Sequence, residues 1–251
     1  MNNISDIELS IVLPCRNEGG VLRKNLEYVM GLLNYMNCNY EIIVVDDGSR
    51  DGTRDTIDGF ISGNPNVKCL KIYHSVPQGQ GKSVADGVHA SQGKIVGIIE
   101  PDFNIHARYI PAFYQAVKQG ADAAIARRYY RVSLLTLHRY LLNVGYRFIA
   151  RAALKVNVHD MEAGFKFFKR GKFIQALEHC SDQQWFWNTE IMAWSSVKGY
   201  KIEEIPCLYL RNVMIGLSAK PLSNSFTYFF KLLRLRKIMK RHIEGQGMFT
   251  F

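Results

Sequence analysis

Hydrophobic and polar positions follow two alternating periods along the first half of the chain. Short apolar runs rich in β-branched residues predict buried strands, and apolar residues three or four positions apart predict helices. The predicted strands are Ser10–Leu13, Glu41–Asp46, Val67–Tyr73, Lys94–Ile99 and Asp122–Ile125. The predicted helices are Gly20–Met36, Gly81–Ser91 and Arg108–Gln119. Strands separated by helices predict an α/β fold with a mainly parallel central sheet flanked by helices.

The second half of the chain has a less regular pattern. It predicts helices at Leu134–Leu154 and Trp185–Lys198 and a strand at Ile205–Leu210. Because no linker rich in Pro, Gly or Ser interrupts the sequence, we expect a single domain over residues 1–222. Residues 223–251 are predicted to form a C-terminal extension.

The extension contains a basic amphipathic helix, predicted over Asn224–His242. Its apolar side chains are Phe226, Phe229, Phe230 and Leu233, and its cations are Lys231, Arg234, Arg236, Lys237, Lys240 and Arg241. A helix of this kind can lie on an anionic membrane surface. It can equally pack on the domain and expose its charged face. The pattern leaves both interpretations open.

Composition places the chain among folded globular proteins, since 47% of its 251 residues are hydrophobic and 22% are charged. No apolar run approaches the ~20 residues that cross a bilayer. The N-terminal segment MNNISDIELS lacks the features of a signal peptide, so a cytoplasmic location is expected. The five cysteines are scattered without CxxC spacing, which indicates reduced thiols rather than disulfides or a zinc site.

The net charge of +10 predicts an anionic partner. Candidates are nucleic acid, a phosphate-bearing substrate and an anionic membrane surface. The chain lacks the interleaved aromatic and basic strands of nucleic-acid-binding modules, so no nucleic-acid partner is expected.

Two carboxylates, Asp46 and Asp47, end one predicted strand and precede a turn rich in Gly and Ser. Ligands of parallel sheets bind beyond the carboxyl ends of the strands, where such carboxylates can accept hydrogen bonds from a ribose or a base. Asp and Gly are also ordinary turn formers, and Asp51 fits the cap of a following helix. The segment therefore predicts either a nucleoside contact or a capped turn.

A second acidic segment, Glu100-Pro101-Asp102-Phe103-Asn104, follows the predicted strand Lys94–Ile99. If this segment is extended, its alternate residues project to one side and present three oxygen ligands. Such a set suits Mg²⁺ or Mn²⁺, which bind few carboxylates and complete their shell with substrate phosphates. A solvated loop at the strand end is the alternative interpretation.

The Gly-rich segment Gln78–Ser83 looks like the end of a phosphate-binding loop. A Walker motif requires Gly at a position that Val76 occupies, so we exclude that motif. Lys82, at the start of a predicted helix, is expected either near a phosphate or as part of a surface cap.

Taken in order, these segments resemble family 2 glycosyltransferases of the GT-A fold. The likeness extends from Leu9 to Ser218 through nine segments. They are SIVLPCRNEGG, EIIVVDDGSRDGT, QGQGKSVADGV, IIEPDFN, AAIARRY, VHDMEAGFKFFKR, WNTEI, GYKIEEIP and RNVMIGLS. The chain is most similar to polyprenyl-phosphate hexosyltransferases, dolichol-phosphate mannose synthases among them, which share D-x-x-x-GF and a late R-x-x-G-x-S.

The resemblance implies a role for each matching position. Glu100, Asp102 and Asn104 would hold a Mg²⁺ or Mn²⁺ ion on the donor diphosphate. Contacts with the nucleoside, the diphosphate or an acceptor phosphate are implied for Pro14, Arg16, Glu18, Asp46, Asp47, Lys82, Arg128, Arg139, Arg211 and Ser218. Arginine suits such contacts because its planar fork binds phosphate oxygens in pairs.

The family also implies an inverting single displacement, with a nucleoside diphosphate sugar of the GDP-mannose or UDP-glucose type as donor. A lipid phosphate acceptor is already anionic and needs no general base, whereas a hydroxyl acceptor requires a carboxylate such as Asp160 or Glu190. Either carboxylate can instead hold an arginine or a helix end in place. A peripheral position on the cytosolic face of a membrane would fit the lipid acceptor.

The chain departs from the family pattern at several places, including Ala163, which replaces a small and often polar residue before Gly164. Glu100 replaces the usual first aspartate of the metal motif, and Ala126-Arg127 replaces the Gly-Ser pair before Arg128. A soluble family 2 glycosyltransferase acting on a hydroxyl is therefore a second hypothesis. A GT-A domain that binds a nucleotide sugar without turnover is a third.

Overall fold

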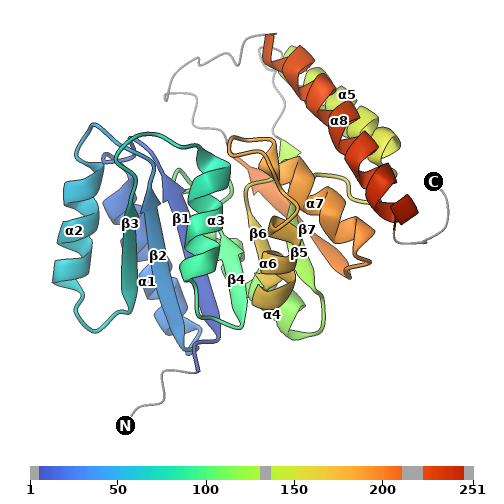
Figure 1. Cartoon of the computed structure of the whole chain (residues 1–251). Coiled ribbons are helices and arrows are strands. Elements are labelled where there is room, and N and C mark those ends of the chain that lie inside the picture. The colour runs from blue at the N-terminus through green and yellow to red at the C-terminus, as the bar shows by residue number, and fades with distance from the viewer. Residues whose placement is uncertain (1–5, 131–136, 211–222, 246–251) are drawn as a thin grey trace.

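A sheet of seven strands forms the centre of the fold (Figure 1). The strands are in the order β3-β2-β1-β4-β6-β5-β7. The structure is a computed structural model that describes residues 6–130, 137–210 and 223–245. The strands are β1 Leu9–Cys15, β2 Tyr40–Asp46, β3 Cys69–Tyr73, β4 Ile95–Ile98, β5 Ala123–Tyr130, β6 Lys166–Lys169 and β7 Ile202–Tyr209. Strands β1 to β4 are parallel, β7 is parallel to β5, and β6 is antiparallel to both of its neighbours. The predicted α/β class with a mainly parallel sheet is confirmed.

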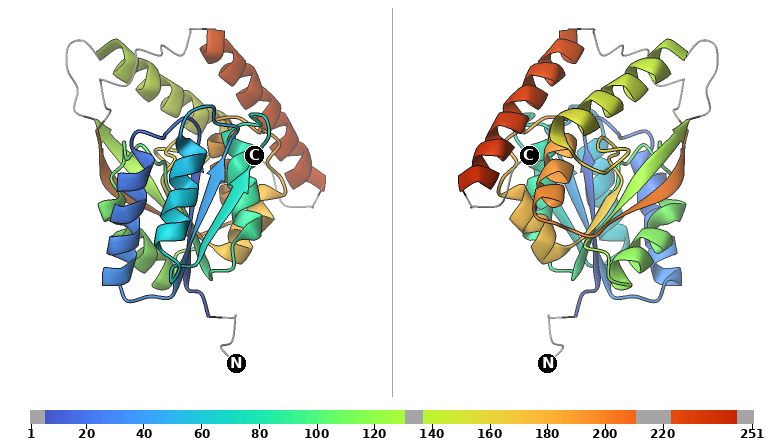
Figure 2. Two further views of the ribbon diagram at one scale, coloured as in Figure 1. Left: turned by 90° about the vertical axis from the view of Figure 1, so that its left-hand side faces the viewer. Right: turned by 90° about the vertical axis from the view of Figure 1, so that its right-hand side faces the viewer.

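Helices cover both faces of this sheet. They are α1 Leu22–Tyr35, α2 Thr53–Gly63, α3 Gln80–Ala90, α4 Ile110–Lys118, α5 Leu137–Leu154, α6 Arg170–Leu177, α7 Trp187–Val197 and α8 Ser223–Gly245, with a short 3-10 turn η1 at Ala107–Tyr109. Figure 2 shows the sheet edge-on between the two helical layers.

Alternate side chains of the buried strands enter two separate hydrophobic cores, as the two-residue period of a strand requires. In β1, Val12 packs with Val84 and Val88 of α3, in the core that also takes residues of α5, α6, α7 and α8. Its neighbour Ile11 faces the other way, toward the core built with α1, α2 and α4. Apolar runs without alternation in β1, β2 and β4 thus reflect burial on both faces.

Strand β6 and helix α6 were not predicted, and the first part of β6 explains why. Lys166 begins the strand and is fully buried, so the sequence KFFK shows a cation where an apolar residue is expected. Its ammonium donates to Ala163 O and to Asn188 Oδ1 of α7, the latter at 2.6 Å. Burial lowers the pKa of Lys166 to about 7. These bonds satisfy a cation that could not otherwise be buried.

Helix α8 packs on the domain through a stripe that the sequence pattern did not indicate. Leu232, Leu235 and Met239 are buried in the core shared with α5 and α7, and Lys231 forms an ion pair with Asp182. This contact supports the interpretation in which the helix packs on the domain. The division at residue 222 into a domain and an extension stays a prediction.

The described helices include none that is long and apolar enough to cross a bilayer.

Candidate functional site

The acidic segment after β4 is a turn, not the extended segment that we expected. Phe103 N donates to Glu100 O at 3.3 Å, and Phe103 has a φ of +52°, which few non-glycine residues adopt. The turn brings Asn104 back onto Asp102: Asn104 N donates to Asp102 Oδ1 at 3.1 Å, and the Asn104 amide donates to the other carboxylate oxygen. Asn104 therefore orients Asp102, and its place as a third metal ligand stays a prediction.

Two carboxyl groups near this turn, those of Asp102 and Glu18, have raised pKa values. Burial, and then the charge of Glu100, raise the pKa of Asp102 to about 6. Burial, followed by the charges of Asp102, Asp51 and Glu100, raises the pKa of Glu18 to about 7. In the described part of the chain, none of Glu18, Glu100 and Asp102 forms an ion pair.

This electrostatic frustration fits a divalent cation. Carboxylates that repel one another without a basic partner are stabilised when a cation binds between them. Among the described residues, no group of three or more His, Cys, Asp or Glu side chains is placed to hold a metal ion by itself. Glu100 and Asp102 can hold a Mg²⁺ or Mn²⁺ ion that takes its remaining ligands from water and a substrate diphosphate.

Glu100 is positioned by residues from three other segments. Gln80 Nε2 of α3 donates to Glu100 Oε1 at 3.3 Å, and Trp187 Nε1 of α7 donates to Gln80 Oε1 at 3.2 Å. The Glu100 carboxyl group also lies directly over Gly164, where a Cβ atom would approach Oε1 to 2.4 Å. The extra length of glutamate is thus accommodated by a glycine.

Gly164→Ala is expected to weaken metal binding about tenfold while leaving the folded state intact. The methyl group would displace the flexible carboxyl group of Glu100 and no backbone atom. Second-sphere changes of this kind typically weaken metal affinity 10- to 100-fold. Titration with Mn²⁺, followed by calorimetry or by activity, measures the effect. Gly171→Ala, at a glycine with nothing within 4 Å, is the matched control.

Asp46 and Asp47, at the end of β2, are both engaged by the protein. Asp46 is fully buried, and its carboxylate accepts hydrogen bonds from Arg54 Nε at 2.7 Å and from Ser49 N at 3.2 Å. The Asp47 carboxylate accepts hydrogen bonds from Gln78 N at 2.6 Å and from Gly79 N at 2.9 Å, and it also contacts the ring of His74. The geometry supports the turn-forming role for both residues, and their nucleoside contacts stay a prediction.

The pKa of Asp47 is lowered, although burial acts in the opposite direction, because His74 and the two N–H groups stabilise its charged form. His74 Nε2 also lies 2.9 Å from the carboxylate of Asp86, and that carboxylate accepts a hydrogen bond from the Lys82 ammonium. Lys82 is therefore paired within α3, as a surface cap would be, and its place near a phosphate stays a prediction.

The loop after β1 lies beside the loop after β2. Asn17 N donates to Ser49 Oγ at 2.8 Å, and Glu18 N donates to Thr53 Oγ1 at 2.9 Å. Pro14 is buried in β1, whereas Arg16 is exposed at the start of the loop. Arg16 and Glu18 are thus available to a ligand at the ends of β1, β2 and β4.

The glycines of the segment Gln78–Ser83 make room for protein backbone. Gly81 N donates to Gln183 O at 2.8 Å, so the start of α3 is covered by the loop before α7. A Cβ atom on Gly79 would lie 2.3 Å from Gln183 O, and one on Gly81 would lie 2.5 Å from Asp182 O. The glycines that look like a phosphate-binding loop are therefore explained by packing against residues 182–183, which lie about a hundred positions later in the chain.

Gly79→Ala is expected to destabilise the protein by about 2–4 kcal/mol, because it combines a backbone clash with a φ of +107° that alanine avoids. Urea denaturation monitored by tryptophan fluorescence measures the change. Gly63→Ala, at the end of α2 with nothing within 4 Å, is expected to change stability by less than about 1 kcal/mol.

Arg128 and Asp160 form a bidentate ion pair. Arg128 Nε and Nη2, from β5, donate to the two oxygens of the fully buried Asp160, both at 2.7 Å. Arg147 Nη2, from α5, contacts the same carboxylate at 2.9 Å. Burial acts to raise the pKa of Asp160, but Arg128 and then Arg147 hold it below its ordinary value.

A carboxylate bound by two arginines is a poor proton acceptor, because its charged form is already stabilised. The geometry therefore supports the arginine-holding role of Asp160 over the role of general base. Arg147 Nε is buried and has no hydrogen-bond partner among the described residues.

Tyr209 connects the acidic turn to the arginines. Its ring lies 5.5 Å from the Arg128 guanidinium and 5.0 Å from the ring of Tyr130. Burial and then the charge of Glu100 raise the pKa of Tyr209, Arg128 opposes the rise, and the resulting pKa is about 12. The charges of both the acidic turn and Arg128 thus act on the pKa of Tyr209.

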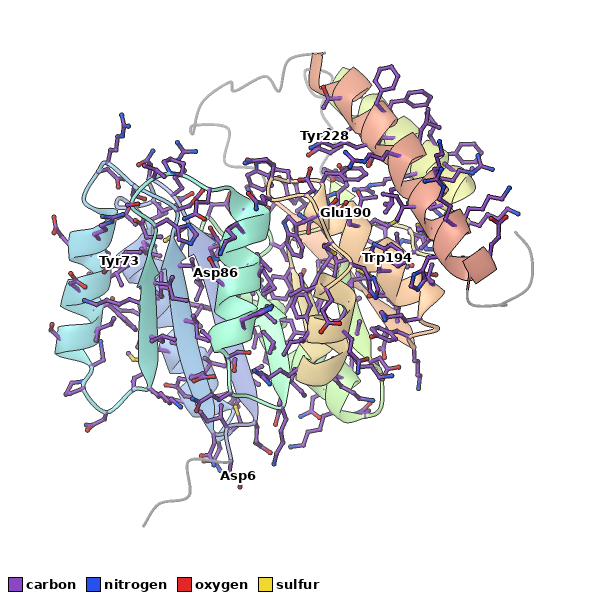
Figure 3. The ribbon with its side chains drawn as sticks, in the orientation of Figure 1. Asp6, Tyr73, Asp86, Glu190, Trp194 and Tyr228 are labelled. Atoms are coloured by element: carbon purple, nitrogen blue, oxygen red, sulfur yellow. The ribbon has the colours of Figure 1, made fainter. Side chains whose placement is uncertain are left out.

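Glu190 lies in the first turn of α7 (Figure 3). Its carboxylate accepts Ser181 N and Asp182 N, both at 2.8 Å. Burial raises the pKa of Glu190, and these donors oppose the rise. The geometry supports its role in holding the loop before α7. Arg211 and Ser218 lie outside the described residues, and Arg139 lies in α5 at a position whose side chain is not described.

Sequence reasoning missed four residues of the site: Gln80, Arg147, Gly164 and Tyr209. Gly164 and Gln80 stand inside segments that matched the family, so the match located them without their contacts. Arg147 is one of several arginines on an amphipathic helix, and only the packing of α5 shows that it points inward.

Comparisons with known proteins agree with one another. The sequence model described as Glycosyl transferase family 2 matches residues 10–177. A Dictyostelium discoideum protein named dolichyl-phosphate beta-glucosyltransferase is 24% identical over 94% of this chain and 76% of its own length. A Pyrococcus furiosus dolichol-phosphate mannosyltransferase is 29% identical over 68% of this chain and 49% of its own length.

A Haloferax volcanii protein named glycosyltransferase AglD is 26% identical over 80% of this chain, but the match spans only 32% of that relative. Among solved structures, glucosyl-3-phosphoglycerate synthase from Mycobacterium tuberculosis superposes with a TM-score of 0.64 at 18% identity. The match covers 92% of this chain and 80% of the other. That crystal contains Mn²⁺, UDP-glucose and phosphoglyceric acid. At this identity the likeness shows a shared fold.

Proposed function

The chain belongs to glycosyltransferase family 2, and from this premise we propose that it transfers a hexose from a nucleoside diphosphate sugar to a polyprenyl phosphate. The transfer inverts the anomeric carbon, and the donor is of the GDP-mannose or UDP-glucose type. Two relatives named for dolichyl phosphate support the acceptor class. A peripheral position on the cytosolic face of a membrane belongs to the proposal.

The observation that carries the proposal is the division of the site around Tyr209. Carboxylates without a basic partner lie on one side, and two arginines with an unused N–H lie on the other. The first side suits a diphosphate bound through a cation, and the second suits a free phosphate. A Mg²⁺ or Mn²⁺ ion held by Asp102 and Glu100 would neutralise the charge that develops on the leaving diphosphate.

The side chains of this protein would then perform two tasks. Arg16 and Glu18 would border the nucleoside, beside the loop that Asp46 fixes. Arg128, oriented by Asp160, would hold the acceptor phosphate so that its oxygen faces the anomeric carbon. Because a phosphate oxygen is already anionic, the attack needs no general base, in agreement with the engaged state of Asp160.

A donor panel tests this function. The protein is incubated with GDP-mannose, UDP-glucose and UDP-N-acetylglucosamine, with Mn²⁺ or Mg²⁺, and release of nucleoside diphosphate is measured. We expect one donor to react only when both a metal and a short polyprenyl phosphate are present. Equal turnover on soluble hydroxyl acceptors would favour a soluble glycosyltransferase. Binding of donors without release would favour a non-catalytic domain.

A further inference from the structure

Helix α8 has two apolar faces, and only one of them is buried. Leu232, Leu235 and Met239 pack inward, whereas Phe230 is 65% exposed, Phe229 45% and Leu233 43%. Phe229, Leu233, Lys237 and Arg241 follow one another at intervals of four residues, so they form a single stripe along the outer side of the helix. The stripe is apolar in its first half and cationic in its second.

Helix α5 extends this exposed apolar surface. Phe148 is 72% exposed and Ile149 47% exposed. The ring centroids of Tyr146 in α5 and Tyr228 in α8 lie 5.9 Å apart, so the two helices contact each other two residues before Phe148 and Phe230. Both views in Figure 2 show α5 and α8 side by side on the outside of the domain. We call Phe148, Ile149, Phe229, Phe230 and Leu233 the outer apolar surface.

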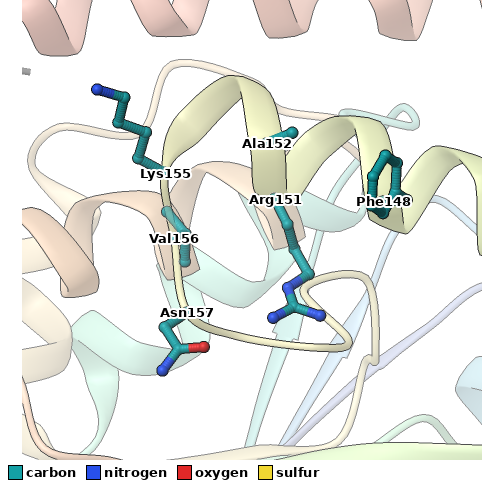
Figure 4. Close-up of a pocket in the computed structure, with 6 residues that line it drawn as sticks. All are labelled: Phe148, Arg151, Ala152, Lys155, Val156 and Asn157. Carbon is teal, nitrogen blue, oxygen red and sulfur yellow. The ribbon is translucent and has the colours of Figure 1, made fainter.

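Cations border the outer apolar surface. Exposed Arg234, Lys237 and Arg241 follow it on α8, and Glu244 is the one acidic residue of that helix. At the end of α5, a pocket of about 380 Å³ is lined by Phe148, Arg151 and Lys155, among others (Figure 4). Aromatic side chains beside a nearly uninterrupted set of cations suit an apolar partner that carries negative charge at its surface.

We propose that the outer apolar surface docks on an anionic phospholipid bilayer. The charge of its border selects this partner over a neutral apolar surface, and aromatic side chains insert at the level of the lipid headgroups. The proposal deepens the proposed function, on which it rests, by naming the surface that meets the membrane. Both helices contribute, so α8 alone does not constitute the docking surface.

Consecutive residues of α5 connect this surface to the site. Arg147 points inward and binds Asp160, while Phe148 points outward. Docking through Phe148 therefore places the arginines one helix diameter from the headgroups, about 10 Å. The docking surface and the arginines of the site therefore lie on opposite sides of one helix.

Vesicle co-sedimentation of the whole chain tests the docking surface without any sugar donor. Vesicles of phosphatidylcholine with about one third phosphatidylglycerol are compared with phosphatidylcholine alone. We expect binding to the anionic vesicles only, and a loss of about tenfold or more in Phe148→Ser/Phe230→Ser and in Arg234→Gln/Lys237→Gln/Arg241→Gln. All five side chains are exposed, so circular dichroism and thermal unfolding should match the wild type.

Two matched controls separate the surface from general properties of the chain. Tyr35→Ser removes an exposed aromatic residue from α1, and Lys24→Gln/Lys198→Gln/Lys201→Gln removes three exposed cations elsewhere. Both should bind vesicles as the wild type does. The proposal is overturned if the wild type ignores anionic vesicles, if the phenylalanine variant binds unchanged, or if the surface instead joins two copies of the chain. Because no donor is present, failure here is distinct from failure of the transfer reaction.

Discussion

Asp102→Asn is expected to abolish sugar transfer and at the same time to raise the melting temperature of the ligand-free protein. Loss of a carboxylate that would hold the Mg²⁺ or Mn²⁺ ion on the diphosphate should lower turnover by at least about 10³-fold, equivalent to roughly 4 kcal/mol in the barrier. The stability gain follows from the raised pKa of Asp102, to about 6, by burial and by Glu100. An acid whose pKa rises on folding destabilises the folded chain at pH values above that pKa.

The pH dependence of this gain has a definite sign. At about pH 8 the wild-type carboxylate is charged in both states, so asparagine should stabilise the fold by about 1–2 kcal/mol and raise the melting temperature by about 2–6 °C. At about pH 5 the wild-type carboxyl group is largely protonated in the folded state, so the gain should shrink.

Differential scanning fluorimetry without metal, together with the donor assay, checks both parts of this prediction. Asp55→Asn, at an exposed position in the first turn of α2, is the control and should retain activity without stabilisation. Wild-type turnover by Asp102→Asn would contradict the assignment of the metal site.

Asp160→Asn is expected to destabilise the protein more than any other single change discussed. Breaking a buried ion pair leaves uncompensated charges, here Arg128 and Arg147, at a cost of about 3–5 kcal/mol. The pKa of Asp160 is lowered by the two arginines against the effect of burial. Its contribution to stability is therefore present above the unfolded-state pKa of an aspartate and is lost as pH falls through the lower folded-state value. Urea denaturation at neutral and acidic pH measures this difference.

The kinetic consequence separates the two roles considered for Asp160. If Asp160 orients Arg128, the asparagine variant should raise the KM for the acceptor phosphate, because the guanidinium loses its bidentate partner. If it were a general base, kcat would fall while stability and KM stayed near wild type. Arg147→Met keeps the Arg128–Asp160 pair and should show a smaller loss of stability, which provides a measurable variant should Asp160→Asn fail to fold.

The sequence pattern located the acidic turn better than it located the rest of the candidate site. Glu100 and Asp102 follow a strand whose apolar run is unambiguous, so their position at the end of that strand could be inferred. The turn at Phe103 could not, because a φ of +52° at a phenylalanine depends on surrounding contacts and not on local propensity.

Contacts between distant segments account for most of what sequence reasoning missed. Gly79 and Gly81 looked like a phosphate loop, but they adjoin Gln183 and Asp182. The buried face of α8 was misjudged because the helix has apolar residues on two sides, and the periodicity alone gives no reason to choose between them. Lys166 concealed β6 because a buried cation is stabilised only by partners that folding supplies.

The reversed strand β6 divides the sheet into two groups of parallel strands, β1 to β4 and the pair β5 and β7. The first group ends in Asp46, Glu100 and the loop of Glu18, while Arg128 belongs to the second and Arg147 to the helix between β5 and β6. The carboxylates and the arginines thus come from consecutive, non-overlapping stretches of chain. Substitutions in α5 and α8 can therefore alter the outer apolar surface without touching any strand that leads to one of these carboxylates. Such an arrangement lets one half of a transferase diversify over evolutionary time while the other half is held constant.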